Sequence, residues 1–113
     1  MSRAYGRAVT ESDAAVGRLL AAADTAFGEG NYTIIVTADH GGHERDHGGN
    51  DPRDVTIPWI VWGRGVKVSE LPGGMIRTMD TASTVLWLLG LNEPTDWLGS
   101  PITSAFITAA GDN

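Results

Sequence analysis

The sequence predicts an α/β fold, a mostly parallel sheet with flanking helices, and three observations support this prediction. An amphipathic segment comes first, two short apolar segments rich in β-branched residues follow, and a second helical segment comes after them. Both short segments are apolar on both faces, as strands of a buried parallel sheet are. The order helix, strand, loop, strand, helix is typical of a layered α/β domain. With 113 residues, of which 42% are hydrophobic, the chain forms one domain at most.

The first helix is expected from the spacing of its apolar residues. Tyr5, Val9 and Val16 begin a series that recurs at intervals of three, four and seven residues and continues to residue 23, which places it on one helical face. Thr10 is also suited to cap a helix, so the helix begins either near residue 5 or near residue 10. Gly28 is placed to end it.

Two strands and a second helix complete the prediction. The strands are expected at residues 32–37 and 57–62, with a long polar loop between them, and a further short strand is expected at 75–78 after a turn-rich link at 70–74. Thr78 or Asp80 is placed to cap the second helix, and Gly90 to end it. Its expected apolar face consists of Ala82, Val85, Leu86 and Leu89.

Composition excludes several classes of function. The 8 Lys and Arg against 14 Asp and Glu give a net charge of −6, which argues against a nucleic-acid-binding patch. The absence of cysteine excludes disulfides and cysteine-based zinc clusters. We find no apolar run of the ~18 residues that a membrane helix needs. We find no signal-peptide pattern either, so the sequence leaves the compartment open.

The loop after the first predicted strand concentrates the residues that can bind metal. Asp39 and His40 follow the strand directly, and His43 and His47 complete the three histidines of the chain. In open α/β sheets, ligands bind beyond the carboxyl ends of strands. Carboxylate oxygen with imidazole nitrogen suits zinc, and also manganese or iron. Gly41 and the glycine after it allow a sharp turn that brings the later histidines back toward Asp39.

A simpler interpretation stands beside this one. An Asp-His pair after a strand is often a turn with a solvated histidine. The nearby carboxylates Asp46, Asp51 and Asp54 are expected to be solvated, with Arg45 and Arg53 as their partners. The tryptophans at 59, 62 and 87 are expected to belong to the core rather than to a substrate platform.

Several ordered stretches resemble the C-terminal part of the alkaline phosphatase superfamily, most closely the type I phosphodiesterase and nucleotide pyrophosphatase group. They are TADHGG at 37–42, HG at 47–48, IPWIVWG at 57–63 and DTASTVLWLLGL at 80–91. The resemblance implies a partial alkaline-phosphatase-like fold and a hydrolase of phosphate or sulfate esters with two divalent metal ions, zinc or manganese. It implies that Asp39 and His40 bind the metal that activates the nucleophile and that His47 binds the other metal. His43 lies outside the His-Gly context and is a secondary candidate.

The same resemblance implies that essential parts lie elsewhere. The nucleophile and the upstream metal ligands of the superfamily match no residue here. We therefore expect residues 1–113 to form a single partial domain, the C-terminal portion of a metallohydrolase, and to be inactive alone. We also expect self-association or dependence on the missing N-terminal part, because half of a sheet leaves an unpaired edge and an uncovered apolar face.

Three alternatives remain open. Residues 43–47 match the His-Glu-x-x-His signature of zinc proteases, which requires those residues to be helical, although the flanking glycines disfavour a helix. The chain is alternatively a small non-enzymatic α/β interaction or assembly module with solvated histidines. The third alternative is a minimal hydrolase that completes its ligand set across a dimer.

Overall fold

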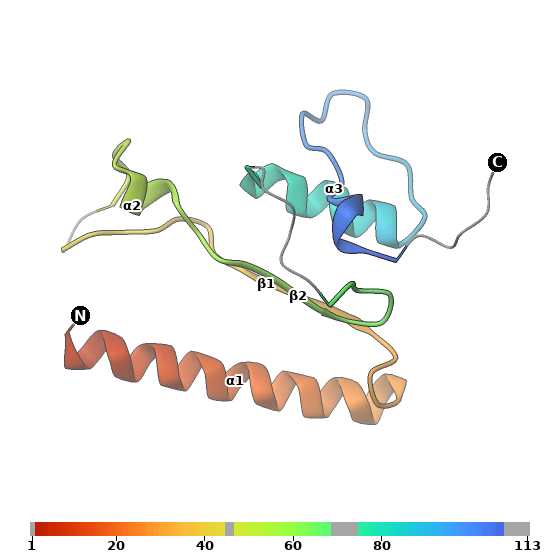
Figure 1. The fold of residues 1–113 in the computed structure, drawn as a ribbon, viewed down its shortest axis with the longest axis horizontal. Coiled ribbons are helices and arrows are strands. Elements are labelled where there is room, and N and C mark those ends of the chain that lie inside the picture. The colour runs from red at the N-terminus through yellow and green to blue at the C-terminus, as the bar shows by residue number, and fades with distance from the viewer. Residues whose placement is uncertain (1, 45–46, 69–74, 108–113) are drawn as a thin grey trace. The chain divides into compact units, whose positions relative to one another are not determined.

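The structure is a computed structural model, and it describes residues 2–44, 47–68 and 75–107. The elements in chain order are α1 (Arg3–Phe27), β1 (Thr33–Thr37), α2 (Pro52–Val55), β2 (Trp59–Gly63), α3 (Thr78–Leu88) and the 3-10 helix η1 (Thr103–Ala105) (Figure 1). The chain divides into two compact units, Met1–Thr33 and Ile34–Asn113, and each is described by itself.

The first unit is the helix α1 and the turn that follows it. The Ser2 side chain caps the helix by accepting a hydrogen bond of 3.1 Å from the Tyr5 backbone N–H. The predicted start near Thr10 is wrong, because the Thr10 hydroxyl donates to the Gly6 carbonyl within the helix instead of capping it. Gly28, with a φ of 89°, ends the helix as predicted.

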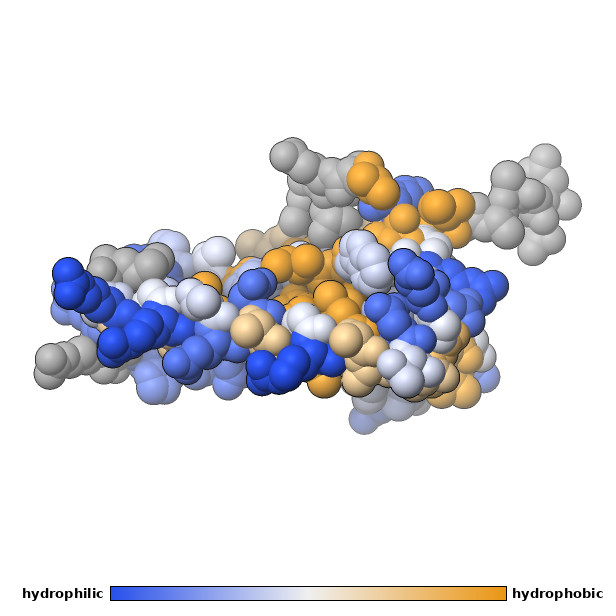
Figure 2. Space-filling view, turned by 90° about the horizontal axis from the view of Figure 1, so that it is seen from below, coloured by the Kyte–Doolittle hydropathy of each residue, from blue (hydrophilic) through white to orange (hydrophobic). Residues whose placement is uncertain are grey.

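Side chains near the end of α1 hold the following turn. The Tyr32 hydroxyl lies 3.0 Å from Asp24 Oδ1 and 3.2 Å from the Leu20 carbonyl oxygen, and the Gly30 N–H donates to the same carboxylate. Figure 2 looks onto one side of α1, where hydrophilic side chains predominate. No described helix is both long enough and apolar enough to cross a membrane.

The second unit is built on a two-stranded sheet of β1 and β2, which lie side by side (Figure 1). The strands are antiparallel, so the expectation of a mostly parallel sheet is wrong for the described residues. A parallel pair needs a crossover connection, usually a full helix. The connection here contains only the single-turn helix α2, and its two ends meet where the Thr37 hydroxyl donates to the Pro58 carbonyl at 3.0 Å.

The helix α3 begins three residues earlier than an Asp80 cap would require and one residue earlier than a Thr78 cap would require. Arg77 is the N-cap, and Asp80 reaches back to accept a hydrogen bond of 2.8 Å from the Arg77 backbone N–H. Gly90, with a φ of 66°, follows the C-cap and ends the helix as predicted. Residues 75–77 form no strand, and the link predicted at 70–74 lies outside the described residues.

The interior of the second unit is small and partly polar. Among its described residues, Ala105 and Phe106 are the buried hydrophobic ones, and the Phe106 ring lies 5.5 Å from the Trp87 ring. The buried residues of α3 are Asp80, Ser83 and Thr84. The predicted apolar face of α3 is largely uncovered, with Val85 41% and Leu89 66% exposed.

The three tryptophans that the sequence assigned to the core, out of four in the chain, differ in their surroundings. The Trp59 indole N–H donates to the Thr81 hydroxyl at 3.1 Å and so connects β2 to α3. Trp87 contacts Phe106, although it is 36% exposed. Trp62 is 51% exposed, so the expectation that it belongs to the core is wrong here.

Candidate metal-binding loop

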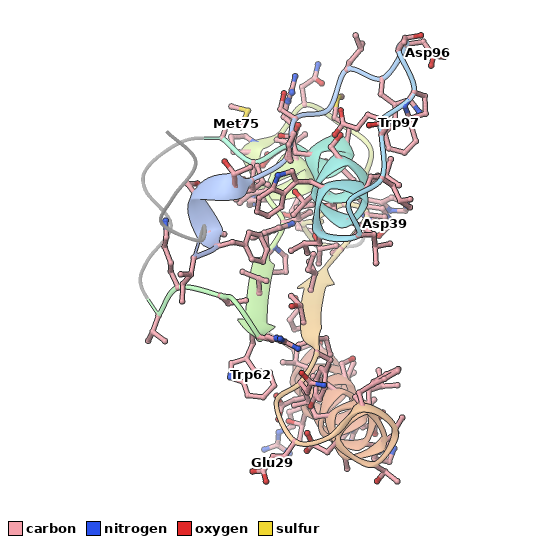
Figure 3. All side chains as sticks on the ribbon, turned by 90° about the vertical axis from the view of Figure 1, so that its right-hand side faces the viewer. Glu29, Asp39, Trp62, Met75, Asp96 and Trp97 are labelled. Carbon is pink, nitrogen blue, oxygen red and sulfur yellow. The ribbon has the colours of Figure 1, made fainter. Side chains whose placement is uncertain are left out.

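The candidate site occupies the connection between β1 and β2. Asp39 lies just beyond the end of β1 (Figure 3). The helix α2, which the sequence analysis missed, lies in this connection. Asp51 is its N-cap and accepts from the Arg53 backbone N–H at 2.9 Å, and proline occupies its first turn. An Asp-Pro pair is a recognised signal for the start of a helix and was the available clue.

The backbone of α2 fixes the glycine turn that follows His40. The Gly41 N–H donates to the Asp54 carbonyl at 2.7 Å, and the Gly42 N–H donates to the Arg53 carbonyl at 2.8 Å. A Cβ atom on Gly41 would overlap the Arg53 carbonyl oxygen and lie 2.8 Å from that of Thr56. Glycine at position 41 therefore permits a close approach of two backbone segments, in addition to the turn that the sequence predicted.

Asp39 and His40 form an oriented pair. The His40 Nδ1 lies 2.6 Å from the Gly41 carbonyl oxygen, and since a carbonyl can only accept, Nδ1 carries the proton. In the neutral imidazole with this tautomer, Nε2 of His40 has the free lone pair. It lies 3.7 Å from Oδ2 of Asp39, and the two side chains are 48% and 88% exposed.

This pair fits a divalent cation. Zinc binds imidazole nitrogen and carboxylate oxygen at about 2.0–2.2 Å. Two donor atoms 3.7 Å apart would then subtend about 125° at the metal, against about 109° in a tetrahedral site. A small rotation of either side chain closes the difference. A histidine that donates its other N–H to a backbone carbonyl is also the usual arrangement of a metal ligand.

His47 lies beside His40. The two rings are stacked, with centroids 4.4 Å apart and planes 8° apart. Stacked rings do not direct their nitrogens to one point. Accordingly, among the described residues no group of three or more His, Asp or Glu side chains converges as a ready metal site.

His43 takes a different partner. Its Nδ1 lies 2.7 Å from Oδ1 of Asp54, whose other oxygen accepts from the Gly49 N–H at 3.1 Å. The bond from His43 is the main cause that lowers the pKa of Asp54, against the opposing effect of burial. Glu44 has a φ of 53°, in the left-handed region, so His43 and Glu44 do not begin the helix that a zinc protease requires.

The carboxylates of the loop divide into two kinds. Asp51 is paired as predicted, because Arg53 donates to both of its oxygens at 2.9 and 2.7 Å, and these bonds lower the pKa of Asp51. The prediction for Asp54 is wrong: this residue is 3% exposed and pairs with a histidine. Arg45 and Asp46 lie outside the described residues.

The site consists of an Asp-His pair at the end of a strand, a glycine turn and a further histidine. This arrangement is a candidate divalent-metal site. The family model described as "Sulfatase" matches residues 1–91 of this chain. The chain therefore belongs to the sulfatase family, within the alkaline phosphatase superfamily.

Curated relatives carry three kinds of name. Steryl-sulfatase of Rattus norvegicus is 34% identical over an alignment of 112 positions that covers 82% of this chain and 19% of that protein. The 2,3-bisphosphoglycerate-independent phosphoglycerate mutase of Pseudomonas putida is 38% identical over an alignment of 103 positions that covers 85% of this chain and 19% of that protein. GPI ethanolamine phosphate transferase 1 of Aspergillus oryzae is 24% identical over an alignment of 121 positions, gaps included, that covers 87% of this chain and 12% of that protein.

These relatives are much longer than the chain, which spans about a fifth of the first two. No solved structure matches the chain significantly. The chain thus corresponds to a portion of the length of these sulfatase-family and phosphoglycerate mutase relatives.

Proposed function

We propose that this chain supplies part of a dinuclear metal site in a hydrolase of phosphate or sulfate esters, and that it is inactive without the rest of that site. The observation that supports this most directly is the His40 arrangement. Its Nδ1–H is held by the Gly41 carbonyl, so that Nε2 is directed to the same space as Asp39 Oδ2, 3.7 Å away. A solvated histidine in a turn would not need a fixed tautomer.

In this proposal the residues of the loop bind two neighbouring metal ions. Asp39 and His40 hold one cation, and His47, whose ring lies 4.4 Å from that of His40, belongs to the second. When bound, two such cations stabilise the attacking and leaving oxygens of an in-line displacement. The chain's own residues bind and orient, and the nucleophile comes from residues that this chain does not contain. His43 remains a secondary candidate ligand, and zinc or manganese is the proposed metal.

The proposed substrate is an ester of a tetrahedral oxyanion. The names of the relatives include a sulfatase, a phosphoglycerate mutase and a phosphate transferase, so sulfate and phosphate groups recur among them. The resemblance of the loop to type I phosphodiesterases and nucleotide pyrophosphatases favours a phosphodiester within this range. The proposed partner is the remainder of the metallohydrolase or a second copy of the chain. The uncovered apolar side chains of α3 support this, because each is costly to leave in water.

Calorimetric titration with Zn²⁺ and Mn²⁺ tests the metal site. The wild-type chain is compared with Asp39→Ala and His47→Ala, and with Asp13→Ala on α1 as a charge-matched control. We expect micromolar binding that falls by more than about tenfold in Asp39→Ala, since loss of even an outer partner of a metal ligand costs about 10–100-fold. Equal affinity in all four proteins would refute the proposal and favour the non-enzymatic module with solvated histidines.

A further inference from the structure

Asp54 holds the metal-binding loop at three points. Its carboxylate accepts from the His43 Nδ1–H at 2.7 Å and from the Gly49 N–H at 3.1 Å. Its backbone carbonyl accepts from the Gly41 N–H at 2.7 Å. These contacts join the segment directly after Asp39 and His40 to the segment directly after His47. One residue on a single helical turn therefore fastens both sides of the loop.

The burial of Asp54 makes this arrangement unusual. The residue is 3% exposed, while Asp51 three positions earlier is paired with an exposed arginine. A buried carboxylate is costly unless hydrogen bonds satisfy it. Here each of its two oxygens has a donor, and neither donor is a lysine or arginine. The pair with His43 therefore fixes the segment after Gly42 to the short helix α2.

We propose that Asp54 is the positioning residue of the metal-binding loop, which it orients through His43 and Gly49 without contacting the metal. This inference rests on the function proposed above. It assigns His43 to the support of the loop in preference to direct ligation. The consequence is that cation affinity at Asp39 and His40 depends on a carboxylate that is not itself a ligand.

Replacement of Asp54 by asparagine changes the hydrogen bonds that the side chain can make to His43 and Gly49. Both donors, the His43 Nδ1–H and the Gly49 N–H, need an acceptor, and a carboxylate provides two oxygens. An asparagine provides one oxygen and one NH₂ group. If its oxygen keeps Gly49, its NH₂ faces His43, which must then move its proton to Nε2 in order to accept. Asp54→Asn therefore changes the tautomer of His43 with almost no change in side-chain volume.

Two measurements on the full 113-residue chain test the inference. Long-range ¹H–¹⁵N spectra of the histidines at pH 8 report the tautomer of His43, and calorimetry reports the affinity for Zn²⁺. We expect an Nδ1–H tautomer in the wild type and an Nε2–H tautomer in Asp54→Asn. We expect Zn²⁺ affinity to fall about 10–100-fold in Asp54→Asn, the range that loss of a supporting contact around a metal site produces. Asp51→Asn, in the same short helix, is the matched control: asparagine keeps an N-cap oxygen for the Arg53 N–H, so this variant should change neither.

A second pair of variants leaves Asp54 intact, in case its replacement prevents folding. The amide of His43→Asn is placed to donate to Asp54 as Nδ1 does, so its affinity for Zn²⁺ should stay within about threefold of the wild type, well short of the loss of an outer partner. His43→Leu removes the donor and should lose affinity as Asp54→Asn does. A large loss in His43→Asn would overturn the inference, because the imidazole itself would then be the ligand.

The two proposals fail in different ways. If the wild type binds no Zn²⁺, the proposed function fails, while the His43 tautomer still tests the role of Asp54. Unchanged tautomer of His43 together with unchanged exchange of the Gly49 amide in Asp54→Asn, or Zn²⁺ affinity in Asp54→Asn equal to that of a wild type that binds, overturns the role of Asp54. A changed tautomer together with faster exchange of the Gly41 and Gly49 amides supports it even without metal.

Discussion

Replacement of Gly41 by alanine tests whether the close approach between the glycine turn and α2 holds the candidate site. The added Cβ would overlap the Arg53 carbonyl oxygen and lie 2.8 Å from the Thr56 carbonyl oxygen. Both obstacles are backbone atoms, so no side chain can rotate away to make room. The turn must move away from α2 as a unit.

The size of the effect follows from the two backbone hydrogen bonds at this contact. They measure 2.7 Å from Gly41 to Asp54 and 2.8 Å from Gly42 to Arg53. A displacement of about 0.9 Å brings both to about 3.6 Å, where a hydrogen bond no longer exists. At roughly 0.5–1.5 kcal/mol for each bond, local stability should fall by about 1–3 kcal/mol.

Amide hydrogen exchange measures this loss directly. The Gly41 and Gly42 amides should exchange about 5–150-fold faster in Gly41→Ala, because about 1.4 kcal/mol corresponds to a factor of ten. Zn²⁺ affinity should fall with them. Gly17→Ala is the control, since a Cβ there meets no atom within 4 Å and alanine favours a helix by about 0.5–1 kcal/mol. Unchanged exchange in Gly41→Ala would refute the role assigned to this contact.

Three further predictions concern the second unit. Gly99→Ala should destabilise it by about 1–3 kcal/mol in urea denaturation, as overpacking does, because the new Cβ would lie 2.6 Å from the Met79 carbonyl oxygen. Phe106→Ala should cost about 3–5 kcal/mol in the same assay, since Phe106 is 2% exposed; a loss below 1 kcal/mol would contradict this. Burial opposes ionisation of Asp80, but bonds from Arg77 and from the residue-100 N–H outweigh it and lower its pKa. The stability that Asp80 contributes is therefore present above its unfolded pKa of about 3.9 and lost as pH falls below it, and Asp80→Asn should remove that part of the acid dependence.

The local features of the fold were accessible from the sequence. Gly28 and Gly90 end their helices because only a residue tolerant of positive φ fits there, and both positions were predicted. The β-branched runs gave both strands to within two residues. The pairing direction was not accessible in this way. A strand apolar on both faces indicates a buried sheet, but the direction of its neighbour depends on how the connection folds.

The sequence was sufficient to predict which residue types form the candidate site. It was not sufficient to predict which side chains form hydrogen bonds with each other. The position of Asp39 and His40 after a strand was sufficient to predict that they lie together. The partner of Asp54 was not predictable, because a carboxylate beside an arginine in sequence usually pairs with it. Here the single turn of α2 directs Arg53 to Asp51 and turns Asp54 inward to His43. That outcome depends on the helix α2, which begins at the Asp51 cap. The many glycine and polar residues of the loop made a helix there hard to predict.

The exposure of the ligand pair determines how tightly it can bind. The Asp39 side chain is 88% exposed and that of His40 is 48% exposed, so water has access to both donor atoms. A cation held by one oxygen and one nitrogen keeps water in its remaining positions, and the high dielectric of water weakens its attraction to the carboxylate. A catalytic zinc site normally has three protein ligands. Each further ligand and each water excluded would therefore strengthen binding at Asp39 and His40. For this reason a partner segment that completes the site should raise Zn²⁺ affinity in the wild type far more than in Asp39→Ala.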